Sequence, residues 1–179
     1  MIEVYYTKNE FVHRKAEILI GRKLGKGFEI KRNENGKPYV SGNPVYFSIS
    51  HSAGRAMIAL SDKPVGIDLE FYRPRKFEHI LKRLSARELK WIDGNFIYFF
   101  LGWVSKEAYV KMKGGTLAQY LKRLEYFEYS LYCDGEKYED TAVLADFAAG
   151  IYAPCAEGSI DHTTKRFKLR KREKLSRRL

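Results

Sequence analysis

The segment Val65-Gly66-Ile67-Asp68-Leu69-Glu70 alternates apolar and acidic side chains, a pattern typical of a β-strand with one buried face. Ile67 and Leu69 then face the core, and the carboxylates of Asp68 and Glu70 lie on the opposite face, ~6–7 Å apart. Two negative charges at that spacing repel unless a cation joins them, and Mg²⁺ prefers oxygen ligands of this kind. The ordinary alternative is a half-exposed strand with an acidic outer face.

Around this segment the sequence predicts an α/β (α+β) fold with a helix over a sheet in each of two small halves. Strands are expected at 2–6, 28–31, 38–40, 45–50, 55–60, 65–70, 127–134, 142–147 and 151–155, and helices at 10–24, 85–93 and 95–113. We place the N-terminal half at 1–70 and the C-terminal half at 71–157. A basic, flexible tail is expected at 158–179.

Charge is concentrated at the C-terminus. The 179 residues contain 33 Lys plus Arg and 22 Asp plus Glu, for a net charge of +11. Residues 165–179 hold nine basic residues and one acidic residue, so +8 of the charge lies in fifteen residues and +3 in the rest. With 45% hydrophobic and 15% aromatic residues, collagen-like, low-complexity and wholly disordered classes are excluded.

The two cysteines favour a reducing compartment, and the hydropathy argues against a membrane span. Cys133 and Cys155 are too few for a disulfide framework and lack the spacing of a zinc site. The longest apolar run, 96–104, is far shorter than the roughly 20 residues of a membrane span. We therefore expect a soluble, cytoplasmic protein without a signal peptide or a membrane partner, and we expect it to be a monomer.

The predicted helix 95–113 carries a second group of polar residues. Trp103, Glu107 and Lys111 recur every four residues and share one face, with Lys106 beside them. The ordinary alternative is a surface ion pair between Glu107 and Lys111. In a functional site, Glu107 would supply a third carboxylate, and the lysine would meet a phosphate or protonate a leaving oxygen.

Two further candidates lie in turns of the N-terminal half. His51 stands between Ser50 and Ser52 just after a predicted strand, where an imidazole, hydroxyls and exposed backbone could cradle a phosphate. A turn histidine with capping serines is the ordinary alternative. Lys37, beside Pro38, is an ordinary solvated lysine when taken by itself.

Four motifs follow one another along the chain: Gly36-Lys37-Pro38, Phe47-Ser48-Ile49-Ser50-His51-Ser52, Gly66-Ile67-Asp68-Leu69-Glu70, and Trp103-Val104-Ser105-Lys106-Glu107-Ala108 with Lys111. Together they resemble the 4′-phosphopantetheinyl transferases of the surfactin-synthetase-activating type, and the resemblance extends over about residues 13–155. The resemblance implies two similar α/β halves related by a pseudo-two-fold axis, with coenzyme A and Mg²⁺ bound in the cleft between them. Mn²⁺ would be the alternative metal.

The resemblance also implies a reaction and the residues that perform it. The phosphopantetheine group of coenzyme A would pass to a serine of an apo acyl, peptidyl or aryl carrier protein, with release of adenosine 3′,5′-bisphosphate. Asp68, Glu70 and Glu107 would hold the metal, and Glu107 would also act as base towards the serine. The residues implied in binding coenzyme A are Arg14, Lys37, Ser50, His51, Lys106 and Lys111, of which Lys111 would also assist the leaving group.

A transferase of this kind would serve fatty acid, polyketide or nonribosomal peptide biosynthesis and would have no need of nucleic acid. The alternative from another class is a catalytically degenerate member of the same fold. Such a protein would bind nucleic acid or an acidic protein through its basic tail, with strong salt dependence and no requirement for Mg²⁺ or coenzyme A.

Overall fold

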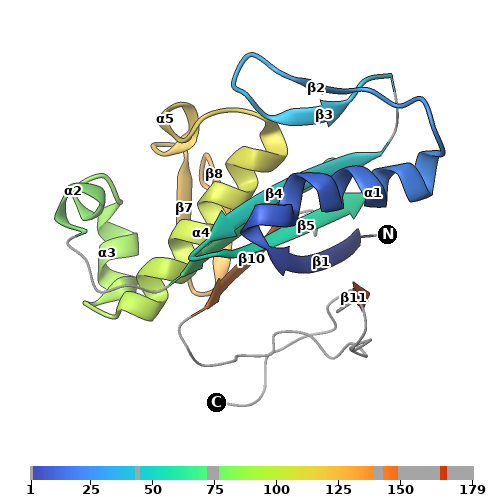
Figure 1. The fold of residues 1–179 in the computed structure, drawn as a ribbon. Coiled ribbons are helices and arrows are strands. Elements are labelled where there is room, and N and C mark those ends of the chain that lie inside the picture. Colours follow the sequence, from blue (N-terminus) through green and yellow to red (C-terminus); the bar gives the residue numbers. More distant parts are fainter. Residues whose placement is uncertain (1, 43–44, 72–76, 139–142, 149–165, 169–179) are drawn as a thin grey trace.

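A computed structural model describes residues 2–42, 45–71, 77–138, 143–148 and 166–168. The chain has a mixed α+β fold, which confirms the predicted fold class (Figure 1). The pseudo-two-fold axis, the cleft and the boundaries of the two halves stay predictions. Among the described residues, no helix combines the length and the apolar character that crossing a bilayer requires.

The N-terminal part is a sheet covered by one long helix. The sheet has the order β11-β1-β5-β4, with all its neighbours antiparallel. Its strands are β1 (Ile2–Lys8), β4 (Tyr46–Ser52), β5 (Arg55–Ser61) and β11 (Arg166–Lys168). A short 3-10 helix, η1 (Asn9–Phe11), leads into α1 (Val12–Leu24), which lies across this sheet, and β2 (Ile30–Arg32) and β3 (Pro38–Val40) form a hairpin (Figure 1).

Strand β5 is buried on both faces, which explains its nearly continuous apolar sequence. Ile58 and Leu60 pack with Leu19 and Ile20 of α1. On the opposite face, Met57 and Ala59 pack with Val65, Ile67 and Leu69, which belong to or directly precede β6 (Gly66–Phe71). The sheet is therefore enclosed between α1 and β6, and this places the acidic strand against the N-terminal part.

The C-terminal part is built around α4 (Phe96–Lys113), which packs on β6 and on its parallel partner β10 (Val143–Ala148). Asn95 caps the start of α4, and Gly114 ends it in the left-handed conformation, so its predicted bounds are confirmed. The other elements of this part are α2 (Glu78–Leu81), α3 (Ala86–Ile92), α5 (Leu117–Tyr120), β7 (Leu124–Phe127), β8 (Ser130–Cys133) and β9 (Glu136–Lys137).

The structure corrects two expectations. The single strand predicted at 127–134 is wrong, because β7 and β8 form a hairpin whose turn residues, Glu128 and Tyr129, both have positive φ. In the predicted tail, residues 166–168 form β11 on the edge of β1. The remainder of 158–179 and the strand predicted at 151–155 lie outside the described residues.

Candidate active site at the β6–α4 contact

A glycine brings β6 and α4 into backbone contact. A Cβ atom placed on Gly66 would lie 1.8 Å from the carbonyl oxygen of Ala108 and 2.5 Å from the backbone nitrogen of Met112. Any side chain at this position would therefore collide with the backbone of the helix. The close approach brings the helix face of residues 107 and 111 next to Asp68 and Glu70, which follow Gly66 on the strand.

Residues of three separate segments meet around Asp68. Its Oδ1 accepts hydrogen bonds from Lys111 Nζ at 2.6 Å and from Ser50 Oγ at 2.8 Å. Lys111 Nζ also donates to Ser50 Oγ at 2.9 Å. The Asp68 side chain is buried and that of Lys111 is 32% exposed, so the pair lies at the protein surface with one open side.

Glu107 adds a partly buried carboxylate to this group. Burial raises the pKa of its carboxyl, and the negative charges of Asp68 and, to a smaller extent, Glu70 raise it further. Lys111 acts in the opposite direction and lowers it. Three carboxylates thus influence one another near a single lysine, and this excess of negative charge favours the uptake of a cation.

The oxygen donors of Asp68, Glu70 and Glu107 suit Mg²⁺, which is usually held by one or two carboxylates together with waters and substrate phosphates. In the part of the chain that the structure describes, no three His, Cys, Asp or Glu side chains are gathered closely enough to hold a metal ion as they stand. Lys111 instead provides the positive charge beside Asp68. The chemistry of the donor set fits a divalent metal.

Lys37 lies at the C-terminal end of α4, where its Nζ donates to the carbonyl of Met112 at 3.1 Å. Asn33 and Asn35, in the turn between β2 and β3, both donate side-chain hydrogen bonds to the carbonyl of Gly114. This turn therefore satisfies carbonyl groups that the helix leaves unpaired. Burial lowers the pKa of Lys37 to about 8.

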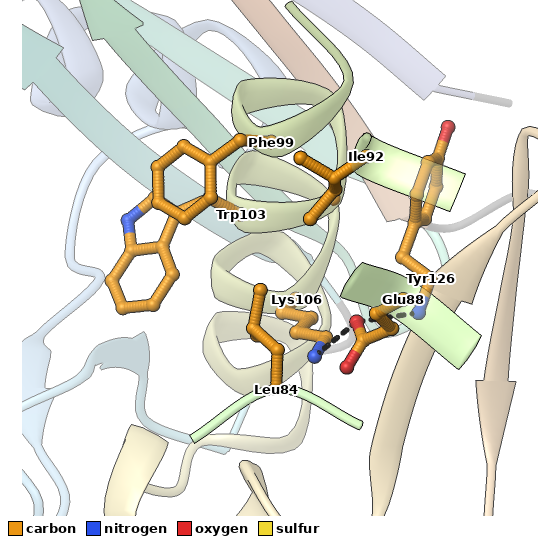
Figure 2. A pocket seen from close by; sticks show the side chains of 8 residues that line it. Leu84, Glu88, Ile92, Phe99, Trp103, Lys106 and Tyr126 are labelled. Atoms are coloured by element: carbon orange, nitrogen blue, oxygen red, sulfur yellow. Dashed lines mark hydrogen bonds and ion pairs between the residues drawn. The ribbon is translucent and has the colours of Figure 1, made fainter. Parts of the chain in front are cut away.

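Lys106 lies on a different face of α4, away from this group of residues. Its side chain is 1% exposed, and Nζ forms an ion pair with Glu88 Oε1 at 2.5 Å (Figure 2). Glu88 also accepts hydrogen bonds from the backbone nitrogens of Ser85 and Tyr126, and so it links α3, α4 and β7. The Lys106–Glu88 pair lines a cavity of about 10 Å³, room for about one water.

Arg14 and His51 are exposed, on α1 and β4 respectively. Neither side chain bonds to Asp68 or Lys111. Of the nine residues predicted for the site, the structure directly joins Ser50, Asp68 and Lys111 and brings Glu107 and Glu70 close enough to influence each other. Lys37 caps the neighbouring helix end, and Lys106 is enclosed elsewhere.

Residues 64–148 match the model of the 4′-phosphopantetheinyl transferase superfamily. This part of the chain is similar to the members of that superfamily. The superfamily match includes β6 and α4, and with them Asp68, Glu70, Glu107 and Lys111. Arg14, Lys37, Ser50 and His51 precede the matched residues.

Curated relatives carry the superfamily's name. A 4′-phosphopantetheinyl transferase of Bacillus subtilis is 34% identical over 99 residues, 51% of this chain and 44% of that protein. The transferase AcpT of Salmonella typhi is 32% identical over 113 residues, 58% of this chain and 59% of that protein. The transferase Sfp of Bacillus subtilis strain 168 is 26% identical over 147 residues, 74% of this chain and 64% of that protein. The chain thus spans about half the length of the first two transferases.

Proposed function

We propose that this chain is a 4′-phosphopantetheinyl transferase that uses coenzyme A and Mg²⁺ to modify a serine of an apo acyl, peptidyl or aryl carrier protein. The observation that carries the proposal is the contact of Lys111 with Asp68, with Glu107 one helical turn before Lys111. Two motifs some forty residues apart in sequence thereby meet in one acidic site beside a lysine, a combination suited to binding a metal and a phosphate. The names of the relatives agree with this assignment.

In this proposal Asp68, Glu70 and Glu107 hold Mg²⁺, or Mn²⁺ in its place. The metal, when bound, neutralises negative charge on the pyrophosphate of coenzyme A, the main requirement of phosphoryl transfer. A bound cation would also offset the repulsion of Glu107 by Asp68 and Glu70, which contributes to the raised pKa of the Glu107 carboxyl. Coenzyme A would lie between the halves 1–70 and 71–157.

Glu107 is the proposed base. Its carboxylate takes the proton of the carrier serine hydroxyl, directly or through a water, as the serine oxygen attacks phosphorus. A carboxylate that shares its charge with the metal is a modest base, and its proximity to the serine hydroxyl would make it sufficient.

Lys111 is the proposed phosphate ligand nearest the reaction. Its half-open ion pair with Asp68 allows the ammonium group to turn towards a phosphate oxygen and to stabilise the departing adenosine 3′,5′-bisphosphate. Lys37, His51 and Arg14 are proposed to contact the phosphates of coenzyme A from the N-terminal part. Lys106 is enclosed with Glu88 instead, and the hydroxyl of Ser50 is already bonded to Asp68 and Lys111.

The decisive experiment is incubation of the full chain with coenzyme A, Mg²⁺ and apo carrier proteins of the acyl, peptidyl and aryl types, followed by mass spectrometry of the carrier. We expect one carrier to gain one phosphopantetheine group, and a chelator to prevent this. Glu107→Gln should lower the rate by about 10²–10⁴-fold. Glu10→Gln, at an exposed glutamate of η1, is the control and should leave the rate unchanged.

The absence of any mass change with all three carrier types at high enzyme concentration would overturn the proposed function. In that case, salt-sensitive binding of DNA or RNA without Mg²⁺ or coenzyme A would favour the nucleic-acid-binding alternative. We further propose that the chain acts as a monomer in the cytoplasm, in fatty acid, polyketide or nonribosomal peptide biosynthesis. Size-exclusion chromatography and cell fractionation test the first two points.

A further inference from the structure

Strand β6 is joined to β4 through serine side chains. Ser48, Ser50 and Ser52 alternate along β4, and their hydroxyls accept hydrogen bonds from the backbone nitrogens of Ile67, Leu69 and Phe71 at 3.1, 3.1 and 3.0 Å. We call these three serines the serine ladder. The residues of each pair differ by a constant nineteen positions, so the two strands run in the same direction.

The serine ladder completes the hydrogen bonding of β6. One edge of β6 pairs with β10, and the nitrogens that face the other way would be buried without acceptors if the serines were absent. Ser48 and Ser50 are each 4% exposed, so water cannot easily replace them. The serines thus hold the strand that carries Asp68 and Glu70 in register with the N-terminal sheet.

Ser50 differs from the other two serines because its hydroxyl has three partners. A hydroxyl can donate one hydrogen bond and accept two. Ser50 Oγ donates to Asp68 Oδ1 and accepts from Leu69 N and from Lys111 Nζ. Its hydrogen-bonding capacity is therefore fully used within the protein. A phosphate oxygen could bond to this hydroxyl only by displacing one of these partners.

We propose that Ser50 is a positioning residue that orients Asp68 for the metal, an inference that rests on the proposed function. Oδ1 of Asp68 is directed to Ser50 and Lys111, while Oδ2 accepts no hydrogen bond from the residues that the structure describes. Oδ2 is thereby kept for the cation. When Lys111 turns to a phosphate, the Ser50 hydroxyl still fixes Oδ1, so Asp68 keeps its orientation during the reaction.

Ser48 provides a matched control. It lies on the same strand, has the same exposure and accepts the same kind of backbone hydrogen bond at 3.1 Å, but its hydroxyl forms no hydrogen bond with Asp68 or Lys111. Ser48→Ala and Ser50→Ala each remove one rung of the serine ladder. Only Ser50→Ala removes the link to the carboxylate and the lysine. Comparing the two variants separates positioning from strand pairing.

The experiment uses the full chain as wild type, Ser48→Ala, Ser50→Ala and Ser50→Thr, the last of which keeps a hydroxyl. Thermal unfolding, Mg²⁺ affinity by titration calorimetry, and kcat and KM of transfer are measured for each. We expect similar decreases in Tm for the two alanine variants. Ser50→Ala alone should weaken Mg²⁺ binding and lower kcat by about 10–100-fold, with KM for the carrier unchanged, and Ser50→Thr should restore most of both.

Equal Mg²⁺ affinity in Ser48→Ala and Ser50→Ala would overturn the positioning role. A higher KM for coenzyme A with unchanged Mg²⁺ affinity would also overturn it and would make Ser50 a phosphate ligand. If the wild type transfers nothing but Ser50→Ala still binds Mg²⁺ more weakly than Ser48→Ala, the proposed function fails and the positioning role stands. A wild type that neither transfers nor binds Mg²⁺ refutes both.

Discussion

Helix α4 carries two lysines that contact carboxylates at almost the same distance in very different surroundings. Lys106 Nζ lies 2.5 Å from Glu88 Oε1, with side chains that are 1% and 3% exposed. Lys111 Nζ lies 2.6 Å from Asp68 Oδ1, with side chains that are 32% and 8% exposed. The two lysines are only five residues apart, yet the first pair is closed to solvent and the second is open on the side of the lysine.

The difference shows how one helix can provide both support and chemistry. Separating a pair that is closed to solvent leaves a buried charge without a counterion, so Lys106 and Glu88 stay together. An open pair has part of its charge in water, where one counterion can replace another at low cost. Lys111 is therefore free to exchange Asp68 for another anion, such as the phosphate of the proposed function, while Lys106 keeps α3, α4 and β7 in place.

The largest expected effect tests the closed pair. Lys106→Met should lower the free energy of unfolding by about 3–5 kcal/mol, because it leaves the buried Glu88 carboxylate without its cation. Urea unfolding at neutral pH measures this loss. Lys90→Met, at an exposed lysine of α3, is the control and should change stability by less than about 0.5 kcal/mol.

Adding Glu88→Gln to Lys106→Met should recover part of the loss, because the amide is neutral and its oxygen can still accept a hydrogen bond. If Lys106→Met lowered the free energy of unfolding by less than about 1 kcal/mol, the Lys106–Glu88 pair would behave like an exposed ion pair. The distinction between it and the Lys111–Asp68 pair would then be wrong.

A substitution in the open pair, Lys111–Asp68, should affect activity strongly and stability only weakly. If the proposed function holds, Lys111→Met should slow carrier modification by about 10²–10³-fold, because it removes the cation proposed to stabilise the transition state. Its free energy of unfolding should change by less than about 1 kcal/mol. Transfer rates and urea unfolding of the same preparations measure the two quantities.

Lys113→Met, at an exposed lysine of the same helix, is the control for Lys111→Met and should keep the wild-type rate. If the two variants transferred at the same rate, Lys111 would have no part in the chemistry.

The smallest expected effect concerns Lys37, which is intermediate in exposure. Its folded-state pKa is lowered from 10.5 to about 8 by burial, so between these pH values the unfolded chain binds a proton that the folded chain does not. The stability of the wild type relative to Lys37→Met should therefore rise as pH increases from about 8 to 10.5, by at most about 1 kcal/mol because solvent screens the charge. Urea unfolding of both proteins at several pH values measures the difference. If the difference in free energy of unfolding between wild type and Lys37→Met stayed constant or decreased as the pH rises, the lowered pKa of Lys37 would be contradicted.

Sequence reasoning predicted the regular elements of the fold well where local signals are strong. The capping box of Ser85 and Glu88 and the glycine after Lys113 mark helix ends that the structure confirms. The hairpin of β7 and β8 was missed because its turn consists of Glu128 and Tyr129. Residues with positive φ in such turns are usually glycine or asparagine, and neither is present here.

The site was predictable as a set of residues but not as a set of contacts. Helical spacing places Glu107 and Lys111 on one face, and the structure agrees. Helical spacing does not reveal that Lys106 forms a buried ion pair, because its partner Glu88 belongs to another helix. Alternating serines on β4 were visible in the sequence, but only the arrangement of β6 shows that Ser50 bonds to both Asp68 and Lys111.

The backbone contact at Gly66 also bears on how the protein folds. Gly66 touches residues 108 and 112, so the strand and the helix meet only after a loop of some forty residues has closed, an event with an entropic cost. We expect the acidic site to appear together with the last tertiary contacts rather than with the first helices. A nascent or partly folded chain would then hold its carboxylates apart, and metal binding would report complete folding.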